Sequence, residues 1–243
     1  MNPRDIDLAT IRTWPAAVTE ERDGWFYLAS GGVTGRVNAV WPLEWRGGDV
    51  EVAIMEAEAW LAARNLPPRF KLTDGAYAPA DLPELLEKRG YEPVMSTLVM
   101  TAPIRALQAP GGVHIHDALP AAFDAVIRET SKDDAEYDER LSIAQRAPQP
   151  AAFALIERAG RPLAIGMCAA AGDLAGVFLM RTAPEARRQG LAREILRALI
   201  SRCSDWNVRT AFLQVDDHNE SAIALYESEG FSTLTAYRFW RRR

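Results

Sequence analysis

The fold is decided by the stretch Thr182-Ala-Pro-Glu-Ala-Arg-Arg-Gln-Gly-Leu-Ala192, a basic turn that joins an apolar run to an amphipathic helix. The apolar run is Leu174–Met180, and the helix is expected over Gly190–Cys203. The first N–H groups of a helix have no partner within the helix, and the helix dipole adds partial positive charge there. The stretch therefore has the properties of a phosphate-binding turn.

Two features of the turn favour phosphate. Arg187 and Arg188 add full positive charges, while Gly190 lets the backbone approach a phosphate without a Cβ, and Ala192 is the next smallest residue. A short basic turn before a helix is also a common form of solvated loop, so the turn alone does not establish the site. The predicted phosphate-binding residues are Arg187, Arg188, Gln189, Gly190, Leu191 and Ala192.

Composition narrows the class of protein. A chain of 243 residues, 48% apolar and 25% charged, is expected to fold unaided as two small domains or one large one. Its formal net charge of −5, from 28 basic and 33 acidic residues, argues against general nucleic-acid binding. An anionic cofactor must therefore be held by local positive charge.

No membrane segment or metal site is expected. The longest apolar stretch, residues 163–172, is shorter than the roughly 20 residues that cross a bilayer, and the start of the chain lacks the apolar core of a signal peptide. A cytoplasmic location is the expectation. Cys168 and Cys203 lie in apolar patterns and are expected to be buried thiols. His114 and His116 share a strand face, but no further ligands lie nearby, so no metal is predicted.

The chain divides into two unequal parts at residues 101–112, which are rich in proline and glycine. The predicted domains are therefore 1–104 and 113–243. In the second, apolar periodicity predicts strands at 113–116, 152–157, 163–170, 175–182 and 211–215, helices at 120–130, 135–146, 190–203 and 220–229, and a final strand pair over 231–240.

The first part echoes the second. Leu85-Leu-Glu-Lys-Arg-Gly-Tyr91 matches Leu225-Tyr-Glu-Ser-Glu-Gly-Phe231 when the chain is shifted by 140 positions. Preceding helix and strand patterns follow in the same order. The two parts are interpreted as copies of one fold, with chance similarity between two amphipathic helices as the alternative.

Two spaced elements carry a family resemblance. They are Pro184-Glu-Ala-Arg-Arg-Gln-Gly-Leu-Ala192 and, further on, Asn219-Glu-Ser-Ala-Ile-Ala-Leu-Tyr-Glu-Ser-Glu-Gly-Phe231. In order and spacing, nearly all of residues 114–240 resembles the GNAT superfamily of acyl-CoA-dependent acetyltransferases. The resemblance implies tandem folds of the α/β (α+β) class, each a mixed and mostly antiparallel sheet flanked by helices.

The first part departs from the family pattern. Before residue 59 it has no Arg-x-x-Gly-x-Gly/Ala turn leading into a helix, and Leu86 stands where the second part has Tyr226. We therefore expect no cofactor and no chemistry there. The first part is interpreted as a structural partner and one possible wall of the substrate pocket.

The resemblance also implies the roles of particular residues. The acetyl-CoA phosphates are expected at the Arg187–Ala192 turn, with the pantetheine arm along Met180, Arg181 and Thr182, in an opening before the strand that ends at Val215. A strand N–H would polarise the thioester carbonyl. Tyr226 is the expected general acid for the leaving thiolate, although the position also suits a core aromatic. Asn219 either bonds the pantetheine or only caps the following helix.

The general base and the acceptor stay open at this level. The strand before the turn carries no acid, which leaves Asp216, Asp217, His218, Asp133, Asp134 and Glu136 as candidates. The acid-rich segment 133–139 hints at a cationic acceptor. Tryptophans 14, 25, 41, 45 and 60 suit core packing more than a substrate pocket. The expected activity is acetyl transfer to a primary amine of a small molecule or a protein, by a monomer or homodimer; the alternatives are a longer acyl donor and a non-catalytic acyl-CoA sensor.

Overall fold

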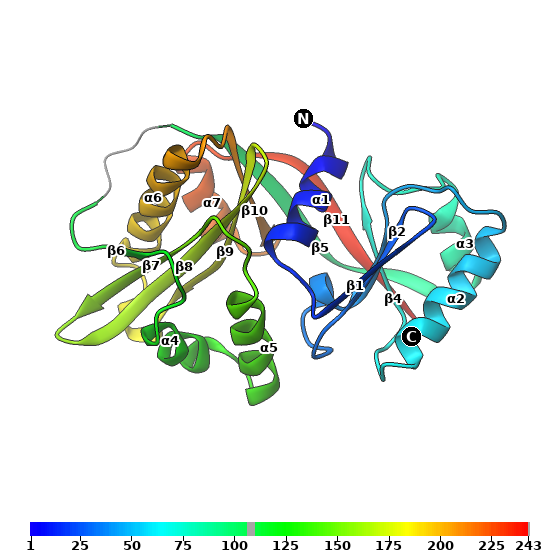
Figure 1. The fold of residues 1–243 in the computed structure, drawn as a ribbon, viewed down its shortest axis with the longest axis horizontal. Coiled ribbons are helices and arrows are strands. Elements are labelled where there is room, and N and C mark those ends of the chain that lie inside the picture. The colour runs from blue at the N-terminus through cyan, green and yellow to red at the C-terminus, as the bar shows by residue number, and fades with distance from the viewer. Residues whose placement is uncertain (106–109, 243) are drawn as a thin grey trace.

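The protein is described by a computed structural model that covers residues 1–105 and 110–242. Within these residues, eleven strands form one continuous mixed sheet that is flanked by helices (Figure 1). The strand order is β1-β2-β3-β4-β11-β5-β10-β9-β8-β7-β6. The predicted mixed fold is confirmed, and its strands join in a single sheet where two were expected.

The elements are bounded as follows. The helices are α1 Pro3–Thr13, α2 Val50–Ala62, α3 Leu82–Lys88, α4 Ala122–Thr130, α5 Asp134–Gln145, α6 Leu191–Cys203 and α7 Glu220–Ser228, with short turns η1 Gly35–Val37, η2 Pro184–Ala186 and η3 Ser204–Trp206. The strands are β1 Val18–Arg22, β2 Trp25–Ala29, β3 Ala39–Pro42, β4 Arg69–Thr73, β5 Tyr91–Pro103, β6 His114–His116, β7 Ala151–Arg158, β8 Arg161–Ala171, β9 Leu174–Thr182, β10 Thr210–Asp216 and β11 Ser232–Arg242.

The predicted elements of residues 113–243 are found in place, with one exception. Where two strands were expected over 231–240, the chain forms the single strand β11, with register shifts near Thr233 and between Arg238 and Phe239. Part of the expected linker is also replaced by a strand, because β5 extends through Pro103. The remainder of that linker includes residues 106–109, which lie outside the described residues.

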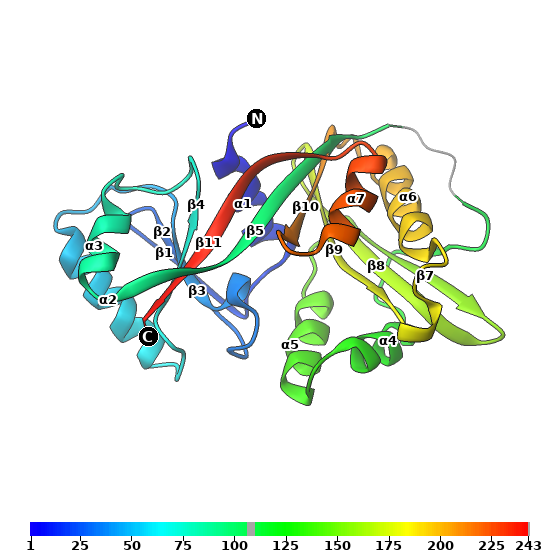
Figure 2. The ribbon, with the colours of Figure 1, turned by 180° about the vertical axis from the view of Figure 1, so that it is seen from behind.

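Strands β5 and β11 lie side by side and run between the two ends of the sheet (Figure 2). β5, from the first part of the chain, pairs with β10 of the second part. β11, the last strand of the chain, pairs with β4 of the first part. Each part therefore completes its sheet with a strand from the other.

The helices cover the sheet on both faces. Under α6 and α7 lies one apolar core, to which α6 contributes the stripe predicted from its periodicity: Leu191, Ile195, Leu196, Leu199 and Ile200 are all buried. A second core lies between the opposite face and α1, α4 and α5. The third belongs to the first part, under α2 and α3. Among the described residues, no helix combines the length and apolarity that a membrane crossing requires.

Candidate functional site

The sheet opens between β9 and β10, next to the predicted turn. These parallel strands pair only as far as Gly176 and Phe212, although β9 continues to Thr182 and β10 to Asp216. On its other edge β9 carries a bulge, because two residues, Leu179 and Met180, stand opposite the single residue Gly166. Leu179 has a positive φ of 50°. A bulge bends its strand and redirects backbone groups, so the free edge of β9 turns away from β10.

Gly166 makes room for this arrangement. A Cβ on Gly166 would lie 2.8 Å from Sδ of Met180 and 2.5 Å from Cγ2 of Ile195 on α6. A larger residue there would push the helix or the bulge away from the sheet. The close packing of α6 against β8 thus fixes where α6 begins relative to the bulge.

The start of α6 has the form expected of an anion site. Gly190 is the N-cap residue, with a φ of 81°, and no side chain caps the helix. Arg188 also has a positive φ, of 59°. The N–H groups of Leu191 and Ala192 are consequently left without intrahelical acceptors. A Cβ at Gly190 would point into open space, so the glycine is required by the backbone conformation, a reason additional to the expected close approach.

A groove of about 870 Å³ lies at this helix start. Arg187 and Arg188 are exposed, and neither has an ion-pair partner within the described residues. All but one of the predicted cofactor residues line the groove: Met180, Arg181, Thr182, Arg187, Arg188, Gly190, Leu191, Ala192 and Asn219. Gln189 does not, since its side chain accepts a hydrogen bond from Arg158 and donates one to the carbonyl of Glu185.

Tyr226 lies in the same groove, on α7. Its side chain is buried, with an exposed fraction of 8%, and burial raises its pKa to about 12. Asn219 caps α7, because its Oδ1 accepts hydrogen bonds from the N–H of Ala222 (3.2 Å) and from Ser221 (3.1 Å). Capping therefore accounts for the asparagine, and its position in the groove leaves a ligand contact open.

A second hollow, of about 320 Å³, adjoins the groove. The two share lining residues at the opening, which are Met180, Arg181, Asn219, Ala222 and Tyr226. The second hollow is also lined by Trp14, Thr34 and Arg36 from the first part of the chain. The first part of the chain thus forms one wall of this hollow. A third hollow, of about 470 Å³, continues from it along Arg36, Arg140 and Asp216.

The candidate general bases differ in whether they line the second and third hollows. Asp216 ends β10 and lines both of these hollows, with one oxygen accepting the N–H of His218. Glu136 lines only the third hollow and is paired with Arg140 at 2.5 Å. Asp133 caps α5, and neither it nor Asp134, Asp217 or His218 lines these hollows.

One carboxylate of the acid-rich segment 133–139 holds a loop of the first part of the chain in place. Glu139 is buried and accepts hydrogen bonds from Val33 N–H (3.0 Å), Thr34 and Asn38 Nδ2 (2.9 Å). It therefore holds residues 33–38, the loop that carries Arg36. Glu136 is paired with Arg140 and Asp133 caps α5, whereas Asp134 and Asp138 of the same segment are exposed to solvent.

The cysteines are buried, as predicted, with sulfur atoms 3.5 Å apart. Burial raises the pKa of Cys168 well above its ordinary value, which suppresses the thiolate. Trp25, Trp41 and Trp60 pack in apolar cores, whereas Trp14 stacks on Phe178 at 5.0 Å and faces the second hollow. Within residues 1–105 and 110–242, no cluster of three or more potential metal-binding side chains occurs.

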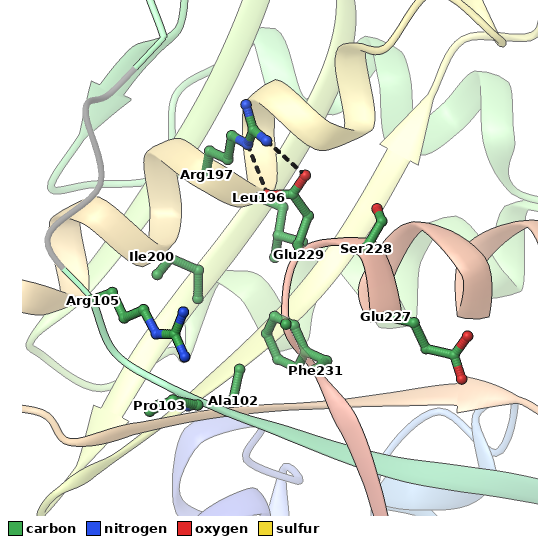
Figure 3. A pocket seen from close by; sticks show the side chains of 11 residues that line it. Ala102, Pro103, Arg105, Leu196, Arg197, Ile200, Glu227, Ser228, Glu229 and Phe231 are labelled. Atoms are coloured by element: carbon green, nitrogen blue, oxygen red, sulfur yellow. Dashed lines mark hydrogen bonds and ion pairs between the residues drawn. The ribbon is translucent and has the colours of Figure 1, made fainter.

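Another hollow, of about 270 Å³, lies between α6, α7 and the end of β5 (Figure 3). None of the predicted site residues lines it. Arg197 is bonded there to both carboxylate oxygens of Glu229, at 2.7 and 3.0 Å, so its charge is compensated within the protein. The chemistry-bearing side chains gather at the opening between β9 and β10.

Sequence reasoning missed the bulge in β9 and the arginines Arg36 and Arg140 that line the second hollow with Tyr226. The bulge has no local signature, because Leu174–Thr182 reads as an ordinary apolar strand. Arg36 lies far from the turn in sequence, and only the packing of the first part against β10 brings it to Gln214, to which its Nη1 donates at 3.1 Å.

Several known proteins resemble this chain in sequence. The family described as "Probable histone acetyltransferase Rv0428c C-terminal" matches residues 2–240. An uncharacterized N-acetyltransferase, YobR, of Bacillus subtilis is 25% identical over 99% of this chain and 98% of its own length. A mycothiol acetyltransferase of Thermobispora bispora is 29% identical, over 59% of this chain and 54% of its own.

The fold is also found among solved structures. A GCN5-related N-acetyltransferase from Kribbella flavida superimposes with a TM-score of 0.72 at 17% identity, covering 100% of this chain and 96% of the other. At that identity the likeness concerns the fold, while the family match extends over almost the whole chain. The chain therefore belongs to the family of the Rv0428c C-terminal region, and it is an N-acetyltransferase of the GNAT type.

Proposed function

We propose that the protein transfers an acetyl group from acetyl-CoA to a primary amine by direct attack on the thioester. The observation that carries this proposal is the opening between β9 and β10, where the groove and the second hollow meet at Tyr226. A donor in the groove and an acceptor in the hollow would approach each other there from opposite sides. Such positioning is a major source of rate acceleration in two-substrate reactions.

The donor binds in the groove at the start of α6. Its diphosphate accepts hydrogen bonds from the unpaired N–H groups of Leu191 and Ala192, with Arg187 and Arg188 supplying charge. The pantetheine arm lies along the free edge of β9, beside Met180 and Thr182, where backbone groups have no strand partner from β10. Gln189 then acts by supporting the turn, since its side chain contacts Arg158 and the Glu185 carbonyl.

The transfer proceeds through a tetrahedral intermediate. The neutral amine forms an N–C bond to the thioester carbon, whose oxygen is stabilised by a backbone N–H of the bulged strand. The C–S bond then breaks, the thiolate takes the phenol proton of Tyr226, and the amine nitrogen loses its extra proton to Asp216 or to water. Burial raises the pKa of the phenol to about 12, so the phenol is protonated at ordinary pH, while the same shift makes it a weaker acid toward the thiolate.

We further propose that residues 1–104 are a degenerate second copy of the catalytic domain, residues 113–243. The elements α2, β4, α3 and β5 follow the same order as α6, β10, α7 and β11. At the start of α2, however, the Asp49 side chain accepts the N–H of Glu51, so a carboxylate occupies the place of an anion. Leu86 on α3 is buried in the core. These differences explain why one copy alone would bind the cofactor.

Substitution of the tyrosine tests the proposal. Tyr226→Phe is expected to lower kcat roughly 10²-fold, because it removes the proton donor while keeping the ring. CoA affinity, measured by calorimetry, should be retained. The assay is thiol release from acetyl-CoA across a panel of primary amines.

Tyr27→Phe is the matched control, since Tyr27 is equally buried but packs under α2, away from the site. It should leave kcat unchanged. Equal turnover by the wild type and Tyr226→Phe would contradict the role of Tyr226 as general acid. Tight CoA binding without turnover of any amine would instead favour an acyl-CoA sensor, and turnover only of longer thioesters would change the donor.

A further inference from the structure

The acceptor side of the site is strongly cationic although the chain as a whole is acidic. The second and third hollows together are lined by six cationic side chains and by two carboxylates, Asp216 and Glu136. The protein carries a formal net charge of −5, so this balance is local. The six are Arg36, Arg69, Arg140, Arg181, Arg241 and Lys132.

Three of these side chains, all arginines, line the second hollow. They come from separate elements: Arg36 from η1, Arg140 from α5 and Arg181 from β9. Arg36 donates to Gln214 at 3.1 Å, and Arg181 donates to the carbonyl of Thr130 at 3.2 Å. Neither has a carboxylate partner among residues 1–105 and 110–242. Arg140 is paired with Glu136, and that pair is mostly buried.

The three charges act on one another. Burial, together with the positive charges of Arg140, Arg36 and Arg187, lowers the pKa of Arg181 to about 10. Burial also lowers the pKa of Arg140; the paired Glu136 opposes this shift, and Arg36 adds to it. Holding like charges together away from water is unfavourable unless an anion compensates them.

The surrounding structure keeps Arg36 in place. Gln214, which accepts from Arg36, also donates to Thr10 Oγ1 at 2.9 Å and accepts from Tyr237 at 3.3 Å. The loop that carries Arg36 is fixed from the other side by the buried carboxylate of Glu139. The arginine is therefore preorganised, and preorganised guanidinium groups are suited to carboxylate and phosphate oxygens.

Arg36 and Arg140 do not line the donor groove, whose phosphate turn has its own arginines at Arg187 and Arg188. We propose that they bind an oxyanion on the acceptor, so that the acceptor is a small primary amine carrying a carboxylate or a phosphate. The amine end points toward Asp216 and the opening, while the anionic end lies against Arg36, Arg140 and Arg181. The second hollow, of about 320 Å³, has the size of a site for a small molecule.

This inference rests on the proposed acetyl transfer. Pairs of amines with and without an anionic group test the anion site separately from the transfer itself. Thiol release is compared for 3-aminopropanoate and its amide, and for 2-aminoethyl phosphate and 2-aminoethanol. We expect each anionic amine to have a kcat/KM about 10-fold or more above its neutral partner, since each charged hydrogen bond contributes strongly in a desolvated site. The carboxylate and phosphate pairs identify which oxyanion is preferred.

Arg36→Gln is expected to reduce the preference to about 3-fold or less, mainly through KM of the anionic member. Arg12→Gln is the matched control, because Arg12 is exposed on α1 and lines none of these hollows. It should keep the preference of the wild type. A thermal melt of each variant confirms folding.

Binding of inorganic phosphate to the CoA-loaded protein, by calorimetry, gives a readout that needs no turnover. We expect it to weaken in Arg36→Gln and to persist in Arg12→Gln. Turnover of neutral amines as fast as anionic ones would overturn the inference and leave acetyl transfer standing. If no amine is turned over but phosphate binding depends on Arg36, the anion site stands and the proposed transfer fails.

Discussion

Lys71 and Asp7 form a fully buried ion pair between β4 and α1. Lys71 Nζ lies 2.6 Å from Asp7 Oδ1, and Thr73 bonds to both side chains. The ammonium also lies 3.8 Å from the ring centroid of Trp41, and burial lowers its pKa to about 8. Desolvation offsets much of the attraction in such a pair, but removal of one partner leaves a buried charge alone.

Lys71→Met is therefore expected to lower the free energy of unfolding by about 3–5 kcal/mol. The double variant Asp7→Leu/Lys71→Met should recover most of that loss, because no charge remains to be desolvated. Lys88→Met, at an exposed position of α3, is the control and should change stability by less than about 0.5 kcal/mol. Denaturant unfolding measures all of these, and a double variant no more stable than Lys71→Met would contradict the argument.

At the scale of the element, α6 combines a stripe that packs on the sheet with a start that faces the groove. The stripe follows from the spacing of apolar residues and was predicted from the sequence. The start depends on two backbone conformations with positive φ, at Arg188 and Gly190. Glycine adopts this conformation at little cost, whereas other residues lose about 1–2 kcal/mol.

Gly190→Ala is expected to cost about 1–2 kcal/mol of stability and to weaken CoA binding, because relief of the strain reorients the N–H groups at the helix start. Gly230→Ala is a close control: its φ is 91°, its Cβ would also enter open space, and it lies after α7, outside the donor groove. It should cost similar stability without changing CoA affinity. Equal loss of CoA affinity in both variants would show that the helix start has no special role.

At the scale of the whole molecule, the exchange of β5 and β11 joins the two parts into one sheet. A fragment of residues 113–243 would lack β5, so β10 and β11 would each lose a strand partner. A fragment of residues 1–104 would lack β11 beside β4. Unpaired strand edges within a core are unfavourable and prone to aggregate.

We therefore expect the intact protein to unfold in a single cooperative transition, and neither fragment to fold alone. Calorimetry of the whole chain tests the first statement, and circular dichroism with hydrogen exchange of the fragments tests the second. Two well-separated transitions, or a separately folded fragment of residues 113–243, would show that the parts are independent domains.

The sequence by itself determined the features that depend on neighbouring residues. The amphipathic stripe of α6, the glycine turn at Gly190 and the spacing to Tyr226 are local patterns, because helix periodicity and turn conformation depend on a few adjacent positions. They were enough to predict the family, and nine of the ten residues proposed to bind the cofactor line one groove. They also predicted the order of elements shared by the two parts.

Only the tertiary structure decided which arginines line the second hollow and how the strands join in one sheet. Arg36, Arg140 and Gln214 are distant in the chain, and no local pattern relates them; their contact results from the packing of the first part against β10. The same holds for Asp7 and Lys71, and for the exchange of β5 and β11. Strand pairing and burial are set by the competition among all surfaces of the chain, so long-range contacts of this kind cannot be obtained from the residues beside them.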